Sequence, residues 1–223
     1  MHVHEALSTR LSVRDFLPAP VPPALIREIL TTAARAPSGG NLQPWHVTVL
    51  AGEPLARLKS LMAERIAACP EGEPAEYDIY PPQLHSPYRE RRFRVGEDMY
   101  RLLGIPREDK AARRAWFARN YQFFGAPMAL FCSVDRRMGP PQWSDLGMFL
   151  QSVMLLLRER GLDSCPQECW SLYHETVGRF ISLPPERMIF CGMAIGYRNP
   201  AHPVNGLVAQ RAPLEEFAGF MGL

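Results

Sequence analysis

Two arginines and a serine alternate near the amino terminus, and their side chains suit an anionic ligand. Arg10, Ser12 and Arg14 occupy every second position, so in an extended segment all three would point to one face. Two guanidinium groups and a hydroxyl on one face match a phosphate group. The alternative is that they are ordinary surface charges. Another isolated arginine, Arg211, stands near a proline close to the other end of the chain, and no local feature links the two ends.

A loop rich in glycine and amide side chains occupies residues 36–45. Gly39 and Gly40 permit a positive φ and a close approach of bare backbone to a ligand. Asn41 and Gln43 each carry a donor and an acceptor, which suits the edge of a planar heterocycle. The alternative is an ordinary polar loop between a helix and a strand.

Residues 161–170 form a third candidate. We predict a loop there, just before a helix, whose free backbone N–H groups would face a ligand. Glu168 has the chemistry of a general acid or base, and Cys165 or Cys169 that of a nucleophile. A nucleophile needs a partnering base, however, and the histidine nearest in sequence is His174. A backbone role is therefore favoured over side-chain catalysis, with a plain proline-fixed turn as the remaining alternative.

Composition and motifs exclude several classes of protein. The chain has 223 residues, of which 47% are hydrophobic and 22% are charged, as expected for a globular protein with a substantial core. A net charge of only +2 gives no support for a nucleic-acid or membrane surface. The chain also lacks the Gly-x-Gly-x-x-Gly, Walker, His-Glu-x-x-His and Gly-x-Ser-x-Gly patterns. Rossmann, kinase and common hydrolase interpretations therefore have no support.

The cysteines and the amino terminus bear on the compartment. The five cysteines include no Cys-x-x-Cys pair, so no metal site or thioredoxin-like site is indicated. Free structural thiols in a reducing compartment are expected instead. A signal peptide has a basic region followed by an apolar one, and the first residues show no such pattern. The sequence also contains no run of about 18 apolar residues, the length needed to span a membrane. The sequence predicts a soluble, cytoplasmic protein.

Hydrophobic periodicity predicts the elements that must position these candidates. The expected strands are 47–50, 128–134 and 188–195, and the expected helices are 5–10, 25–34, 55–66, 88–103 and 107–122. Residues 146–157 are apolar on almost every face, which predicts a central helix buried all round, with packing against a partner subunit as one option. The fold class is therefore α+β, a mixed sheet flanked by helices, in a single domain spanning residues 1–223.

Residues 69–90 break the periodic pattern with several prolines and predict an irregular, partly mobile segment. The two helices expected after it carry a series of arginines, among them Arg89, Arg91, Arg92, Arg94, Arg113, Arg114 and Arg119. Such a series is commonly a solvated face. The alternative is a lid that attracts an acidic substrate.

Together these segments resemble the FMN-dependent nitroreductase family, nearly from end to end. Residues 10–16 resemble its amino-terminal phosphate and ribityl motif, and residues 36–45 its second motif. Residues 161–170 are similar to the loop along the flavin, and residues 196–214 to the closing phosphate motif. The elongated helical segment, at about 70–122, resembles the subgroup that acts on nitrobenzoates and related nitroaromatics.

The resemblance implies a nitroreductase-like fold and a domain-exchanged homodimer with FMN at the subunit interface. It would place Arg10, Arg14 and Arg211 on the FMN phosphate, with Ser12 toward the ribityl chain. Ala209 stands where many members carry a second basic phosphate ligand, which shifts that contact toward Arg14. The other residues it places at the flavin are Pro37, Ser38, Gly39, Asn41, Asn120, Pro166, Gln167, Glu168 and Cys169, the last three through backbone N–H groups near N5.

The implied activity is NADH- or NADPH-driven reduction of a small nitroaromatic compound, nitrobenzoates included, to a hydroxylamine by ping-pong hydride transfer. The flavin N5 would carry the chemistry, so no catalytic side chain is implied. Two alternatives remain. One is another flavin chemistry of the same family, such as flavin, enone or dehalogenating reduction. The other is a flavin-binding protein without turnover.

Overall fold

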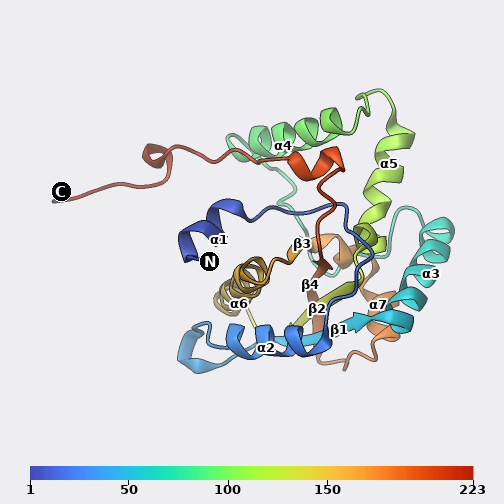
Figure 1. Ribbon diagram of the computed structural model, residues 1–223, viewed down its shortest axis with the longest axis horizontal. Helices are drawn as coiled ribbons and strands as arrows, with labels where there is room; N and C mark the ends of the chain where they lie inside the picture. The colour runs from blue at the N-terminus through green and yellow to red at the C-terminus, as the bar shows by residue number, and fades with distance from the viewer. Residues whose placement is uncertain (223) are drawn as a thin grey trace.

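The computed structural model describes residues 1–222, and a four-stranded sheet lies at its centre (Figure 1). In spatial order the strands are β1 (His46–Ala51), β2 (Met128–Asp135), β4 (Arg187–Gly196) and β3 (Asp163–Gln167). Each neighbouring pair of strands is antiparallel. In addition, Ser12 forms an isolated parallel bridge with Ser164 of β3. Helices flank the sheet, so the predicted α+β architecture is confirmed.

The two central strands divide the core into two layers. Side chains alternate along β2, as they must in a strand. Leu130 and Cys132 pack with helices α2 (Pro23–Ala33) and α6 (Pro140–Glu159), while Ala129 and Phe131 pack on the opposite face, toward α3 (Gly52–Ala68) and α7 (His174–Phe180). Because both faces are covered, β2 is apolar at nearly every position, and this is why the sequence predicted it well.

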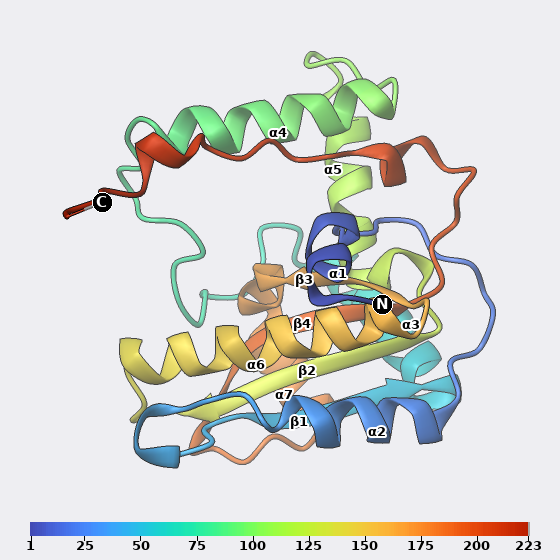
Figure 2. The ribbon, with the colours of Figure 1, turned by 60° about the vertical axis from the view of Figure 1, so that its left-hand side comes forward.

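The other elements surround this body. Three further helices are α1 (Val3–Thr9), α4 (Tyr88–Leu102) and α5 (Lys110–Ala118), and the 3-10 turns are η1 (Gly39–Asn41), η2 (Arg119–Gly125), η3 (Glu168–Tyr173), η4 (Pro203–Gly206) and η5 (Leu214–Glu216). Helix α4 stands away from the sheet beside the carboxyl-terminal segment (Figure 2) and has no buried residue. Within residues 1–222, no helix has the length and apolar composition needed to cross a membrane.

The expected loop at residues 161–170 is instead the edge strand β3 followed by η3. Its polar residues and its proline concealed the strand in the sequence. Pro166 is tolerated because an edge strand leaves one side without ladder hydrogen bonds. Asp163 is buried, and its carboxylate is compensated by ion pairs with Arg198 at 2.7 and 2.8 Å and with Arg158 at 3.2 Å.

Helix α6 is not buried all round within one chain, contrary to the expectation. Leu146, Val153 and Leu157 are fully buried against the sheet, whereas Met148 on the other side is 39% exposed. The continuous apolar run therefore supplies apolar side chains to two faces of α6, of which one packs on the core and the other is exposed within one chain.

Candidate functional site

The two ends of the chain meet in a basic cavity of about 290 Å³. It is lined by Arg10, Ser12, Arg14, Ala209 and Arg211 together with apolar neighbours from α1, α4 and residues 207–208. None of these three arginines forms an ion pair with any residue of 1–222. The guanidinium groups of Arg14 and Arg211 donate only to nearby main-chain carbonyl oxygens.

The electrostatics of this cavity favour an anion. Burial, and then the positive charge of Arg211, lower the pKa of the Arg10 guanidinium below its ordinary value. Two like charges thus face each other without a carboxylate between them. A phosphate would relieve the repulsion and accept charge-assisted hydrogen bonds from both groups.

The segment carrying Arg10, Ser12 and Arg14 is extended, as its alternation predicted. Val13 is fully buried in the core, and its N–H donates to the carbonyl oxygen of Ser164 at 3.0 Å. The bridge between Ser12 and Ser164 fixes the segment beside β3. With Val13 turned inward, its neighbours Ser12 and Arg14 line the cavity.

A residue that the sequence did not single out, Asn205, ties the two ends together. Its Oδ1 accepts from the N–H of Arg14 at 2.9 Å, and its Nδ2 donates to the carbonyl oxygens of Asp15 at 2.7 Å and Asn199 at 2.9 Å. The side chain is buried. Asn205 thereby fixes the backbone of Arg14 to the segment that leads to Arg211, across 191 residues of sequence.

Replacing Asn205 by aspartate should lower the free energy of unfolding by about 3 kcal/mol, since a buried oxygen would then face two carbonyl oxygens with no donor between them. Urea unfolding followed by circular dichroism measures the change. The same replacement at the exposed Asn41 is the control and should change stability by less than about 0.5 kcal/mol. Equal effects at the two positions would contradict the bonding described for Asn205.

A second cavity of about 430 Å³ adjoins the first, with Arg14 lining both. Asn120 and the turn Pro166–Cys169 line it, and so do the aromatic residues Tyr80, Tyr100, Trp116, Phe117 and Phe124. Aromatic walls with a few polar groups are typical of a site for a planar ligand. A phosphate-sized basic cavity thus continues into one suited to a flat ring.

Buried contacts fix the turn at residues 166–169. The Gln167 side chain points inward, where its Nε2 donates to the carbonyl oxygen of Asn120 at 2.7 Å and to its Oδ1 at 3.2 Å. Trp170 is fully buried and stacks on Phe123, with ring centroids 4.7 Å apart. Glu168 and Cys169 begin η3, so their N–H groups have no partner within that turn of helix.

The cysteines at this turn are poor nucleophiles. Burial raises the pKa of the Cys165 thiol to about 11 and raises the pKa of Cys169 well above its ordinary value. Both therefore remain protonated at neutral pH, and a neutral thiol is weakly reactive. The backbone role predicted for this turn is favoured over covalent catalysis.

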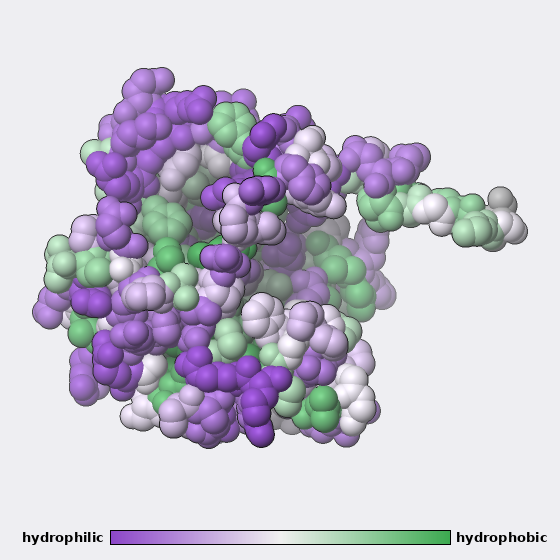
Figure 3. Space-filling view, turned by 180° about the vertical axis from the view of Figure 1, so that it is seen from behind, coloured by the Kyte–Doolittle hydropathy of each residue, from purple (hydrophilic) through white to green (hydrophobic). Residues whose placement is uncertain are grey.

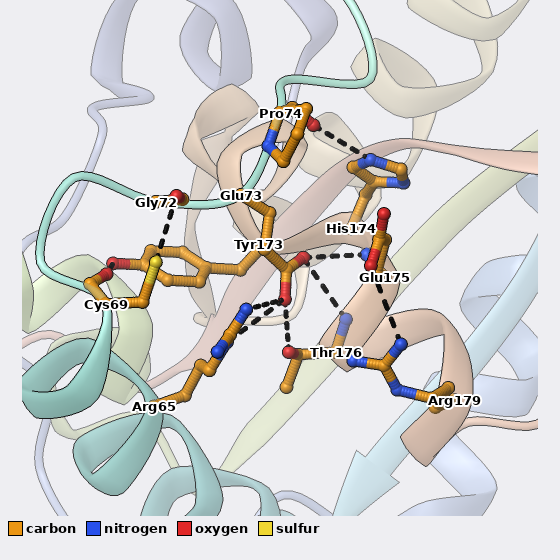
Figure 4. A network of polar contacts seen from close by, with 10 residues as sticks. All are labelled: Arg65, Cys69, Gly72, Glu73, Pro74, Tyr173, His174, Glu175, Thr176 and Arg179. Atoms are coloured by element: carbon orange, nitrogen blue, oxygen red, sulfur yellow. Dashed lines mark hydrogen bonds and ion pairs between the residues drawn. The ribbon is translucent and has the colours of Figure 1, made fainter.

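A buried carboxylate, Glu73, lies against the first turn of α7 (Figure 4). It accepts hydrogen bonds from the N–H groups of Glu175 at 2.9 Å and Thr176 at 3.2 Å, from the Thr176 hydroxyl and from Arg65. Its own N–H donates to the carbonyl oxygen of Leu172 at 2.7 Å. The irregular segment 69–90 is therefore anchored at its start. The sequence did not reveal this because an isolated acid among prolines resembles a solvated one.

Glu73 should make the protein sensitive to acid. Burial alone would raise its pKa, but the hydrogen bonds from Thr176, Glu175 and Arg65 outweigh burial, so its pKa lies below the ordinary 4.5. A lowered pKa stabilises the fold above pH 4.5, and that stability is lost as pH falls through the lowered pKa. Glu73→Gln should cost about 2 kcal/mol at pH 7 and flatten the fall in urea midpoint below pH 4.5. A parallel fall in both proteins would contradict this assignment.

The loop at residues 37–41 lies apart from both cavities, on the other side of α6 (Figure 2). The N–H of Gly39 donates to the carboxylate of Asp145 at 3.2 and 3.3 Å, and Ser38 Oγ accepts from the N–H of Gln43 at 3.0 Å. Only Gly40 of the glycine pair has a positive φ, 57°. Pro37, Ser38, Gly39 and Asn41 are therefore not brought to Arg10 or to the turn within one chain.

Comparison with known proteins shows the family to which the chain belongs. The model of the nitroreductase family matches residues 7–197, and the chain belongs to that family. It is 36% identical to a nitrobenzene nitroreductase of Ectopseudomonas oleovorans, covering 98% of this chain and 96% of the relative. It is 38% identical to a 4-nitrobenzoate reductase of Pseudomonas putida, covering 97% and 94%. The crystal structure of the FMN and NADPH-dependent nitroreductase NfnB from Sphigopyxis sp. strain HMH covers both chains fully, with 50% identity and a TM-score of 0.97.

Proposed function

We propose that this protein is an FMN-dependent oxidoreductase that uses NADPH or NADH to reduce nitroaromatic compounds to hydroxylamines in a ping-pong reaction. One observation carries the proposal: three arginines without acidic partners in residues 1–222 line a cavity that adjoins an aromatic one. The relatives named above support it, because they are nitroaromatic reductases and one is described as FMN and NADPH-dependent.

The residues present fit FMN. Arg10, Arg14 and Arg211 would hold its phosphate, and Ser12 would lie toward the ribityl chain. Asn120 and residues 166–169 would border the ring, with the N–H groups of Glu168 and Cys169 as donors to its edge. When bound, FMN supplies the hydride-transfer chemistry. The chain itself binds and orients the ring and, through the aromatic walls of the second cavity, keeps water away from it.

We further propose a domain-exchanged homodimer in which residues 37–41 of the second copy complete each site. Exposed apolar side chains support it: Val3 and Leu7 on α1 are 70% and 51% exposed, and Phe217 and Phe220 are 71% and 63% exposed. The last two belong to a carboxyl-terminal segment that extends from the body (Figure 1). Apolar surface of this kind is typical of an interface between subunits.

The remaining parts of the proposal concern organisation and compartment. Residues 70–122 would be an insertion within a single domain spanning residues 1–223. The five free cysteines support a reducing, cytoplasmic location. The partners are small aromatic molecules and a second copy, rather than nucleic acid or a membrane.

Steady-state assays with purified protein test this function. With FMN and NADPH or NADH, nitrobenzene or 4-nitrobenzoate should be consumed and the hydroxylamine identified by chromatography. Parallel assays with free flavin, an enone and a haloaromatic compound address the other chemistries of the family. Turnover confined to one of those compounds would replace the nitroaromatic assignment, and flavin binding without any turnover would contradict an enzyme.

A further inference from the structure

Most arginines of α4 are already engaged. Arg89 pairs with Glu90, Arg91 with Glu216 and Arg101 with Asp98. Arg94 donates to the Gln210 side chain at 3.0 Å. These contacts are exposed to solvent, so these four arginines match the solvated face that the sequence indicated.

Arg92 is different. No other residue of 1–222 forms a hydrogen bond or an ion pair with its guanidinium group, which lies over the Tyr80 ring at 4.0 Å from the centroid. A guanidinium held against a ring face is positioned by a cation–π contact. Its N–H groups remain available at the edge of the guanidinium plane, where a carboxylate binds in a bidentate manner.

The location of Arg92 connects it with the proposed chemistry. Arg92 and Tyr80 line the same cavity as residues 166–169 and Asn120. The surface below α4 is hollowed, with hydrophilic residues around the rim and hydrophobic ones deeper (Figure 3). Of the other charged groups in this cavity, Arg14 also lines the phosphate cavity, and Glu168 is the exposed acid of the turn. Arg92 is therefore the cation available to a ligand other than the cofactor.

We propose that Arg92 binds the carboxylate of an anionic nitroaromatic substrate, such as a nitrobenzoate, and makes the enzyme prefer this class over neutral nitroarenes. The proposal rests on the proposed function and deepens it. The relatives do not decide the question, since one is named for neutral nitrobenzene and another for 4-nitrobenzoate at similar identity. Aromatic walls would hold the ring of either compound, whereas only the carboxylate gains from the guanidinium group.

Matched substrates and variants test this role. 4-Nitrobenzoate and 4-nitrobenzamide have nearly the same shape and differ in charge. In Arg92→Gln the KM for 4-nitrobenzoate should rise about tenfold, as expected when one charge-assisted interaction is lost, while the KM for the amide stays the same. Arg92→Lys should restore part of the loss. Arg89→Gln, on the same helix but outside this cavity, should change neither KM.

A binding measurement provides a readout independent of turnover. Benzoate cannot be reduced as a nitro compound, and its binding to the oxidised holoenzyme can be followed through the flavin spectrum. Its Kd should rise about tenfold in Arg92→Gln and stay unchanged in Arg89→Gln. Absence of turnover with both nitro compounds would contradict the proposed function, and benzoate would still report on Arg92.

Two results would overturn the assignment. One is an equal rise in KM for acid and amide in Arg92→Gln, which would make Arg92 a structural residue. The other is a rise in the KM for NADPH but not for NADH, with both nitro compounds unaffected. That result would assign the guanidinium group to the 2′-phosphate of NADPH.

Discussion

Replacing Arg211 by glutamine should raise the Kd of the protein for FMN by roughly ten- to a hundredfold. The variant loses charge-assisted hydrogen bonds to the phosphate worth about 1.5–3 kcal/mol. Titration of the apoprotein with FMN, followed by flavin fluorescence, measures the Kd. Riboflavin lacks the phosphate, so its Kd should be the same for the variant and the unmodified protein.

Stability separates this role from a structural one. Arg211 repels Arg10 when no anion is bound, so the apo form of Arg211→Gln should be as stable as the unmodified apoprotein or slightly more stable. Arg137→Gln removes an arginine that is 89% exposed and paired with Asp135, and it should leave the FMN Kd unchanged. If FMN and riboflavin lose affinity equally in Arg211→Gln, the phosphate does not bind in this cavity.

Replacing Gly192 by alanine should destabilise the protein by about 3 kcal/mol. A Cβ at this position would overlap Cδ1 and Nε1 of Trp170. Trp170 is fully buried between Phe123, Phe131 and Tyr121 and has no space to move. Because it follows the turn at residues 166–169, the displaced ring should also disturb that turn and weaken FMN binding. Urea unfolding and FMN titration measure the two effects.

The matched control is Gly96→Ala in α4, where a Cβ meets nothing within 4 Å. Alanine is the better helix former, so this variant should be more stable by about 0.5–1 kcal/mol. A Gly192→Ala protein with unchanged stability would show that Trp170 is not packed as described.

Local patterns predicted the central elements because those elements are simple. Residues 128–134 are continuously apolar, as a strand covered on both faces must be, and the structure extends β2 by only one residue. The alternation of Arg10, Ser12 and Arg14 indicated an extended segment, which Val13 fixes by its burial. These features depend on neighbours along the chain and are therefore visible in the sequence.

Features that depend on distant partners were not visible. Edge strand β3 contains Pro166 and a buried Asp163, which acquires its partner Arg198 only in the folded chain. Asn205 and Glu73 are isolated polar residues whose hydrogen bonds reach 191 and 103 residues along the chain. Residues of these types are usually solvated, so nothing in their local sequence distinguished them.

In the candidate site too, features set by neighbouring residues could be predicted from the sequence, whereas features that depend on distant partners could not. The sequence supplied the cations, but only the resemblance to a family connected Arg10 with Arg211, and folding brings the two into one cavity. The loop at residues 37–41 remains a prediction, because its place at the site requires a second copy of the chain. Arg92 could be selected among many arginines only because the structure shows that its neighbours on α4 form ion pairs.

The most direct measurement of the proposed function is an anaerobic titration of the FMN-loaded protein with NADPH, repeated with NADH, and followed by one equivalent of a nitroaromatic compound. The visible absorbance of oxidised flavin should disappear with at least one nicotinamide. It should then return when nitrobenzene or 4-nitrobenzoate is added, without oxygen. A flavin that neither nicotinamide reduces, or that stays reduced after the nitro compound is added, would contradict the proposed nitroreductase activity.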